Sequence, residues 1–549
     1  MTRIGIVAAA LGIWGGCAAG KTTSGTGSDG GADAAVTSFR CLGNTTCRVG
    51  DSTRVYECEP THAPGKMLAT CDAGTVCSLG RCVSQSCADG EMRASATGCL
   101  FYIAMLDNVT SDDDKPALII VTNPGPDSAM VTLQERTPDN QWSSPTPIVI
   151  SAASAASFTA VKPQVQASPP SYSPPDPPPA RRVVSDAPVT VMMVESDDAD
   201  NMASSSSGTM VLPAHALGTL YMTMSYQQFE TPKVDAIPGS QGGAAEYSVV
   251  ATQDRTTLWI YAPGQPEMAM PKPVTLAHDG DVYHYFTSSD HDNLAGTVIA
   301  SNQRVAVFSG NVTTTYGQNA GGLNSPDMAM EQMMPTGSWS KVYIAAHLPP
   351  QTGTCDSIFP GGAQSFWQII ASENSALSYT TRSGQPIPGF PVYATKGLPY
   401  PFFVPTDDDF IVTGENPILV TQGMDCEPTL ASAIPGDAPS DVQVFTLAPN
   451  FDHMLAIVRK NDLNNPHSVW LDNSDISDLF SPVSPDTPDS SLVFEVARVP
   501  VPPCQGTVDR CVHTLTGAWG MTLRGMDTSS SYSTTFPSWV QCAGDSCSP

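Results

Sequence analysis

Runs of aspartate are the residues of this sequence that could most readily bind a metal ion. Asp112–Asp114, Asp197–Asn201 and Asp407–Asp409 each offer several carboxylate oxygens, which are the ligands that Ca²⁺ prefers in proteins. None of the three runs has the spacing of an EF-hand or the glycine of a Ca²⁺-binding loop. We therefore interpret them as solvated acidic turns, and we predict no metal site and no cofactor.

Histidines and one Glu-Gln pair are the next candidates for chemistry. His278, His284 and His291 lie at intervals of seven and six residues, which in a strand need not place the three side chains on one face. We expect them in surface loops rather than in a metal site. Glu331 and Gln332 supply one carboxylate and one amide, which do not make an acid and base pair. We expect this pair to anchor a loop through hydrogen bonds to backbone amides.

No catalytic motif of a common type accompanies these residues. The sequence has no G-x-S-x-G elbow, no H-E-x-x-H helix, no P-loop and no G-x-G-x-x-G after a strand. We assign no catalytic residue and predict that the protein is not an enzyme. The alternative is an extracellular glycan hydrolase, whose two carboxylates cannot be identified by sequence among 53 acidic residues.

Cys17 is the residue for which the sequence predicts a covalent modification. The apolar stretch 4–14 follows a basic residue and forms an export signal that is too short to remain as a membrane-spanning helix. Gly15, Gly16 and Cys17 resemble the lipobox of bacterial lipoproteins, in which the cysteine is lipidated and becomes the new N-terminus. Residues 18–40 are typical of a flexible polar linker. We predict an exported protein that is anchored by lipid to the cell envelope, at the outer membrane because Cys17 is not followed by Asp.

The other cysteines predict disulfides. Without Cys17, 14 of the 15 cysteines remain, an even number in an exported chain. Eight of them lie in residues 41–99, where apolar residues are too few to form a core, and these predict a small disulfide-rich module: Cys41, Cys47, Cys58, Cys71, Cys77, Cys82, Cys87 and Cys99. No C-x2-C pair of a zinc site occurs among them. Local bridges are expected for the other six, Cys355 with Cys426, Cys504 with Cys511, and Cys542 with Cys547.

The composition favours strands and excludes some partners. Lys and Arg number 25 against 53 Asp and Glu, which gives a formal net charge of −28 and repels the phosphates of nucleic acid. The chain has 44 Gly and 49 Pro, and charged residues make up only 14% of it, which argues against long helices and coiled coils. We predict an all-β protein with under about 10% helix. Its 549 residues are too many for one hydrophobic core.

Recurring phrases place the strands from residue 100 onward. A proline, a short turn and a strand recur in residues 210–225, 333–347 and 446–460. An alternating apolar strand after a polar turn recurs in residues 185–194, 301–310, 414–423 and, more loosely, 517–525. A hairpin-like phrase recurs in residues 121–133, 251–260 and 371–379. In the second copy of the alternating strand we expect Val305 and Val307 to face a core.

These phrases define about four units, followed by a disulfide-stapled tail at residues 529–549. The predicted units are residues 100–200, 201–311, 312–426 and 427–528. Alternating strands at this spacing favour tandem antiparallel β-sandwich-like units after the small disulfide-rich module. A propeller-like array is the alternative, although a propeller blade has only about 40 to 50 residues.

Two phrases in residues 296–346 carry a family resemblance. GTVIASNQRVAVFSGN precedes MEQMMPTGSWSKVYIAA, and related patterns follow at residues 417–422 and 513–525. On these phrases, the chain from about residue 100 to residue 540 resembles the IgGFc-binding protein N-terminal domain family. In the family, the Glu-Gln pair that corresponds to Glu331 and Gln332 follows an acidic segment. Residues 326–330 stand in the place of that segment here. The resemblance implies an extracellular domain without an established enzymatic activity, in an arrangement similar to that of exported lipoproteins of myxobacteria.

Repetition and export together lead to an expected function. We expect a cell-surface lipoprotein that acts as a binding or adhesion module for an unknown extracellular protein or glycan. Repeated surfaces bind with avidity even when each contact is weak. The lipid on Cys17 would join the protein to the membrane, and the acidic surface excludes nucleic acid as a partner.

Overall fold

The fold is known from a computed structural model that describes most of the chain. The described residues are 45–48, 51–58, 64–92, 96–106, 116–137, 139–161, 180–195, 206–226, 244–263, 271, 273–287, 292–314, 327–348, 364–405, 408–424, 429–436, 442–462, 467–483, 492–504, 507–526 and 531–536. The chain divides into units of residues 1–38 and 39–549, and all described residues lie in the second unit.

Disulfides hold a small module at the start of the described chain. It consists of β1 (Thr45–Arg48), β2 (Asp51–Cys58), β3 (Pro64–Thr70), β4 (Thr75–Ser78), β5 (Arg81–Ser84) and α1 (Gln85–Glu91). Its bridges are Cys47–Cys77, Cys71–Cys82 and Cys87–Cys99, and Cys58 is also disulfide-bonded. The predicted disulfide-rich module is thereby confirmed.

The first large sheet shows the plan that the next two repeat. It contains β6 (Gly98–Ile103), β7 (Pro116–Asn123), β8 (Ala129–Glu135), β9 (Ile148–Ile150), β10 (Ser154–Val161), β11 (Arg181–Glu195) and β12 (Ser207–Val211). The long strand β11 pairs with β6 and β8 through its first half and with β7 and β12 through its second half. Pro188 lies where β11 changes its partner strands. Proline has no backbone N–H, so it suits a break in the hydrogen bonds between strands. One strand thus serves two layers, as in a sandwich with strands that switch sheets.

The second and third sheets follow the same plan around the long strands β18 and β25. The second contains β13 (Gly218–Met222), β14 (Ala245–Ala251), β15 (Thr256–Tyr261), β16 (Val274–Leu276), β17 (Val282–Phe286), β18 (Val298–Thr314) and β19 (Asp327–Gln332). The third contains β20 (Ser340–Ala345), β21 (Gln364–Ala371), β22 (Ser375–Thr381), β23 (Tyr393–Ala394), β24 (Tyr400–Pro405), β25 (Phe410–Met424), β26 (Leu430–Ser432) and β27 (Ile434–Pro435). In both, the first half and the second half of the long strand pair with different neighbours.

The recurring proline phrase has one structure in two places. Pro213 and Pro335 each precede a single 3-10 turn, η1 (Ala214–Ala216) and η2 (Thr336–Ser338), which leads into β13 or β20. The tyrosine at the shared interval then accepts a hydrogen bond from the first residue of its own strand. Gly218 N lies 2.7 Å from Tyr221 Oη, and Ser340 N lies 3.4 Å from Tyr343 Oη. The sequence repeat is therefore a repeat of structure.

The last part of the chain forms two sheets. One has the order β28 (Val442–Thr446), β34 (Val512–Thr516), β30 (Trp470–Leu471) and β31 (Ser474–Asp475). The other has the order β32 (Ser481–Pro482), β33 (Leu492–Val501), β29 (Asp452–Asp462), β35 (Gly520–Met526) and β36 (Ser531–Phe536), so the sheet continues past residue 528. The 3-10 turns η3 (Ser477–Leu479) and η4 (Val508–Arg510) lie in the connections. The predicted bridge Cys504–Cys511 is confirmed.

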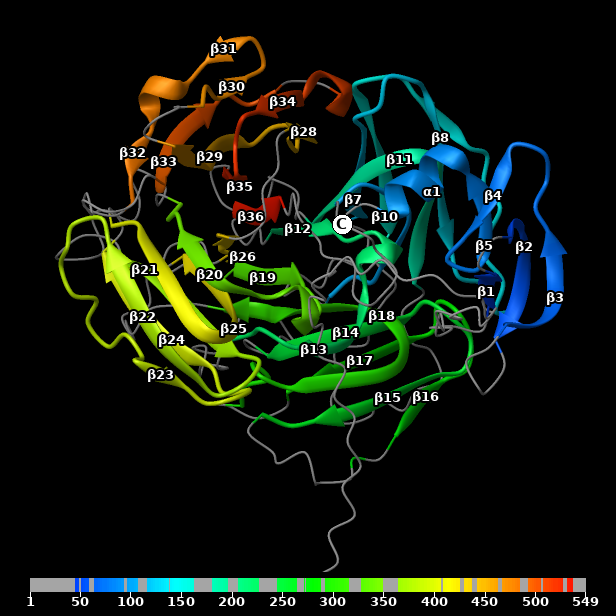
Figure 1. Ribbon diagram of the computed structural model, residues 1–549, viewed down its shortest axis with the longest axis horizontal. Coiled ribbons are helices and arrows are strands. Elements are labelled where there is room, and N and C mark those ends of the chain that lie inside the picture. The colour runs from blue at the N-terminus through cyan, green and yellow to red at the C-terminus, as the bar shows by residue number, and fades with distance from the viewer. Residues whose placement is uncertain are drawn as a thin grey trace, which may run out of the picture. The chain divides into compact units, whose positions relative to one another are not determined.

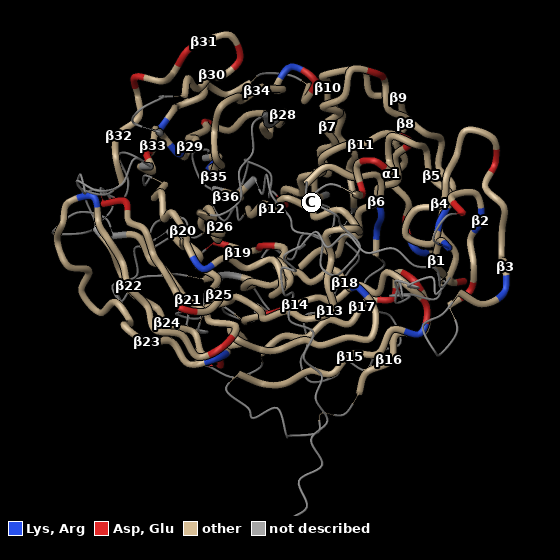
Figure 2. Tube along the Cα trace, viewed as in Figure 1, with Lys and Arg blue, Asp and Glu red and all other residues tan. Residues whose placement is uncertain are grey.

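Tandem, nearly all-β organisation is confirmed (Figure 1). All strand pairs among the described residues are antiparallel, and α1 is the one α-helix there. Val305 and Val307 are fully buried as expected, and their neighbours Ala306 and Phe308 are fully buried too. Both faces of β18 are therefore packed. Charged residues lie mainly in turns and at strand ends (Figure 2).

Candidate functional site

Four strands, one from each large sheet and from the last sheet, meet in the interior. β12 contacts β19 and β36, and β26 contacts the same two strands (Figure 1). We call the meeting of β12, β19, β26 and β36 the central crossing. Ser and Thr hydroxyls link its strands: Met330 N donates to Ser207 Oγ (2.9 Å), Gln332 N to Thr209 Oγ1 (2.8 Å), Met210 N to Thr534 Oγ1 (2.8 Å), and Thr535 Oγ1 to Ser432 O.

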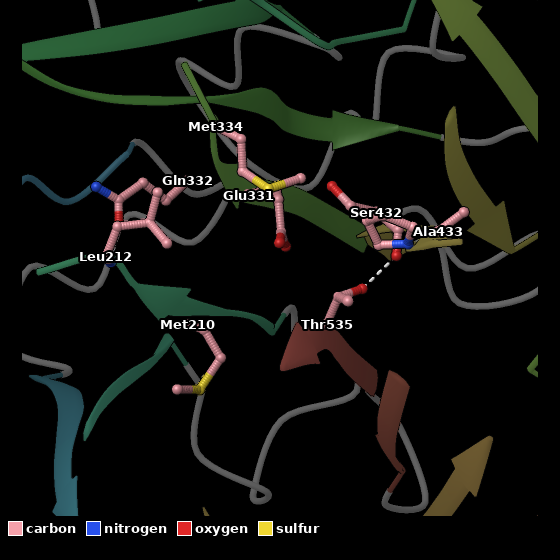
Figure 3. Close-up of a pocket in the computed structure, with 9 residues that line it drawn as sticks. Met210, Leu212, Glu331, Gln332, Met334, Ser432, Ala433 and Thr535 are labelled. Atoms are coloured by element: carbon pink, nitrogen blue, oxygen red, sulfur yellow. Dashed lines mark hydrogen bonds between the residues drawn. The ribbon is translucent and has the colours of Figure 1, made fainter. Parts of the chain in front are cut away.

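A small cavity lies at the central crossing (Figure 3). Its described lining comes from all four strands and their flanks: Met210, Leu212, Glu331, Gln332, Met334, Ser432, Ala433, Pro435 and Thr535. Its volume is about 10 Å³, and one buried water needs about 10–15 Å³ on the same measure. The cavity therefore fits a single water molecule rather than an organic ligand. Glu331 is the one carboxylate among the described lining residues.

Glu331 and Gln332 play different parts in this cavity. The Gln332 Oε1 atom accepts a hydrogen bond from Leu212 N at 2.6 Å, so the expected anchoring of backbone by this side chain is confirmed. The Glu331 carboxyl group points into the cavity instead (Figure 3), and its Oε2 atom has no hydrogen-bond partner. Burial raises the pKa of Glu331 well above its ordinary value, and the contact with Thr209 offsets this only in part. The expectation of backbone anchoring is wrong for Glu331.

A buried ion-pair cluster joins the third sheet to the last one. Asp409 Oδ1 accepts from His347 N at 3.0 Å and from the Arg498 guanidinium, which also lies 2.7 Å from His347 Nδ1. Burial alone would raise the pKa of Asp409, but the hydrogen bond to His347 and the charge of Arg498 outweigh it and hold this pKa below its ordinary value. Asp408 accepts from Ser383 N at 3.0 Å. Both aspartates are buried, so the interpretation as a solvated turn is wrong for them.

The remaining sequence candidates do not form a metal site in the part of the chain that is described. His278 is exposed, whereas His284 is buried with Nδ1 2.7 Å from Ser248 Oγ, so a surface loop is the wrong interpretation for His284. His291 and the runs 112–114 and 197–201 lie outside the described residues, as does Asp407. No group of three or more potential ligands that could hold a metal ion occurs among the described side chains.

Sequence reasoning missed a second contact between sheets, centred on Trp142. Its Nε1 donates to Asp279 Oδ2 at 3.0 Å, and the Arg182 guanidinium lies 4.2 Å from the indole ring centre and 3.2 Å from the same Asp279 oxygen. Trp142 and Arg182 belong to the first sheet and its loops, and Asp279 to the second. These residues are up to 137 positions apart, so no local pattern could reveal the cluster.

Exposed aromatic side chains lie at the outer strands of three sheets. Tyr285 on β17 is 45% exposed, Tyr393 on β23 is 51% exposed and Trp470 on β30 is 42% exposed. β17 and β23 are edge strands, and β30 is next to an edge. Tyr285 stacks on Tyr247 with ring centres 5.6 Å apart, which restricts its movement.

The family assignment rests on a long match. The profile of the family described as IgGFc binding protein matches residues 207–525, more than half of the 549 residues. The chain belongs to this family. The matched region begins at β12 and ends within β35, so it contains β12, β19 and β26 of the central crossing. No curated protein and no solved structure matches the chain. Among the described helices, none has the length and apolar character needed to cross a membrane.

Proposed function

We propose that this member of the IgGFc-binding protein family is an exported binding module whose units engage an extracellular protein or glycan together. The exposed aromatic residues Tyr285, Tyr393 and Trp470 carry the proposal, because each belongs to a different sheet. Tyr and Trp contribute large contact areas at low entropic cost and are enriched among the residues that dominate binding energy. Three separate weak contacts add through avidity.

Fixed contacts between the sheets support this proposal. The Asp409 cluster, the Trp142 cluster and the central crossing join neighbouring sheets through part-buried or buried hydrogen bonds. A surface that is held rigid before binding loses less conformational entropy when it binds. Surfaces on different sheets can then bind one partner at the same time.

Binding to immobilised ligands tests the proposal. The full chain with Cys17→Ser, which cannot be lipidated, is applied to arrays of glycans and of extracellular proteins, including mucins and antibody Fc. We expect retention by at least one class of ligand and weaker retention after Tyr285→Ala, Tyr393→Ala or Trp470→Ala. Leu220→Ala is the matched control, since Leu220 is also an exposed apolar residue, at 43%.

We further propose that a lipid on Cys17 holds the module at the outer membrane. Residues 1–44 lie outside the described part of the chain, so this proposal rests on the lipobox-like Gly15-Gly16-Cys17. Metabolic labelling with an alkyne fatty acid should label the parent in the membrane fraction and leave Cys17→Ser unlabelled. An unmodified parent chain in the culture fluid would refute the anchor.

The alternative of a glycan hydrolase has less support. Glycoside hydrolysis commonly needs two carboxyl groups about 5 to 10 Å apart, whereas Glu331 is the one carboxylate among the described residues that line the central cavity. Release of reducing ends from a glycan that the array identifies would favour the hydrolase. Retention without cleavage favours the binding module.

A further inference from the structure

Glu331 is an unusual residue because its carboxyl group lies in the protein interior without an opposite charge among the described residues around its cavity. The side chain leaves β19 at the central crossing and is only 5% exposed. Its Oε2 atom has no hydrogen-bond partner, and its carboxyl group points into the cavity (Figure 3). No Lys, Arg or His is among the described residues that line this cavity. An ionised carboxylate here would have at most one water, and no cation among the described lining residues, to stabilise it.

The strands that pack against Glu331 bring few titratable groups. The described residues of β12 and β26 include none. β36 brings Tyr532, whose hydroxyl lies 2.9 Å from His453 Nε2 and accepts from Ala448 N. β18 brings Arg304, whose charge acts on Tyr221, and β19 itself brings Asp327, which accepts from Ser206 N at 2.7 Å.

We infer that Glu331 is held as a protonated carboxylic acid that donates to one water in the central cavity, and that release of this proton loosens the central crossing. A buried water needs two to four polar partners. Glu331 Oε2–H is one donor to it. Thr535 Oγ1 gives its own hydrogen to Ser432 O and keeps lone pairs that accept a hydrogen bond from the water.

When Glu331 ionises, its O–H bond breaks and the proton passes to a base in the solvent. No other bond changes. The folded protein binds this proton more tightly than the unfolded chain does, because burial raises the pKa. Stability from this residue is therefore fully present below the ordinary pKa of 4.5 and is lost as the pH rises toward the folded pKa. The central crossing should be tightest in mild acid.

Thermal unfolding of the full chain tests this inference. The variants are Glu331→Gln, which replaces the protonated acid by an amide of the same shape, and Glu415→Gln, which removes an exposed carboxylate as a control for the net charge of −28. At about pH 8, we expect the Tm of Glu331→Gln to exceed that of the parent by about 2 °C or more. At about pH 4, below the ordinary pKa of 4.5, the two should agree. Glu415→Gln should follow the parent at both values.

Hydrogen exchange supplies a second readout in the parent protein. The amides of Met210 and Leu212 donate across the central crossing. Their protection, corrected for the pH dependence of exchange in an unfolded peptide, should fall between about pH 5 and pH 8. It should stay constant in Glu331→Gln.

Three results would overturn the inference. The first is a Glu331→Gln variant that tracks the parent at every pH. The second is a variant that fails to fold, because an amide should replace a protonated acid without loss. The third is a rise in Tm of the parent, but not of Glu331→Gln, on addition of Ca²⁺ or Na⁺, which would mean that an ionised Glu331 binds a cation.

Discussion

His453 shows at the residue scale how burial sets a pH limit. Burial, with a smaller effect of the His513 charge, lowers the pKa of His453 from 6.5 to about 3, so the folded protein holds this imidazole neutral. Because the unfolded chain binds the proton more tightly, stability from this residue is complete above 6.5 and is lost as the pH falls toward 3. We expect His453→Gln, which retains a polar group near Tyr532, to lose less stability than the parent between about pH 7 and pH 4. Urea unfolding at the two values measures this, and parallel losses would contradict it.

Val307 tests the packing of the long strands. Val307→Asp places a charge at a fully buried position on β18 and should cost about 3–5 kcal/mol, a large share of the 5–15 kcal/mol that typically stabilises a domain. Val149→Asp is the matched control, since Val149 on β9 is 66% exposed. Thermal unfolding should show a large loss for the first variant and little change for the second. Equal Tm values would show that β18 is not a core strand.

Residue identity predicted burial well for apolar side chains and poorly for polar ones. Val305 and Val307 could be assigned to a core because β-branched residues alternate there. Glu331, His284 and Asp409 could not be assigned, since acids and histidines are normally exposed. The burial of Asp409 and His284 depends on partners far away in the sequence, Arg498 and Ser248, whereas Glu331 is buried by the meeting of strands from separate sheets.

At the scale of secondary structure elements, Gly310 sets the distance between the strands β18 and β19. A Cβ atom at this position would lie 1.7 Å from Ala329 O, so Gly310→Ala must push the two strands apart. We expect a cost of about 1–3 kcal/mol from this overpacking. Gly337→Ala is the matched control, because a Cβ atom there meets nothing within 4 Å. Chemical unfolding would contradict this account if both variants matched the parent.

Elements were predictable where their residues alternate or follow a proline. The repeated phrases located β11, β18 and β25 and the strands that follow Pro213 and Pro335. The strands β12 and β36 are short and rich in Ser and Thr, and such segments are also typical of loops. The central crossing was therefore not predictable, although its hydroxyl groups are what link its strands.

At the scale of the whole molecule, the limits of the four units and the N-terminal lipid remain predictions. The cyclic contacts of β12, β19, β26 and β36 join sheets that are distant in sequence. Fixed sheets with separate exposed aromatic residues are the physical basis of the proposed avidity. The proposal therefore requires the aromatic residues to act together.

Dissociation from a ligand-coated surface tests this requirement most directly. The full chain with Cys17→Ser, its three single alanine variants at Tyr285, Tyr393 and Trp470, and the triple variant are compared on the ligand that the array identifies. We predict slower dissociation at higher ligand density, a modest loss for each single variant, and a loss of about 10²-fold or more in apparent affinity for the triple variant. If no ligand retains the chain, or if the triple variant dissociates at the parental rate, the proposed binding function is contradicted.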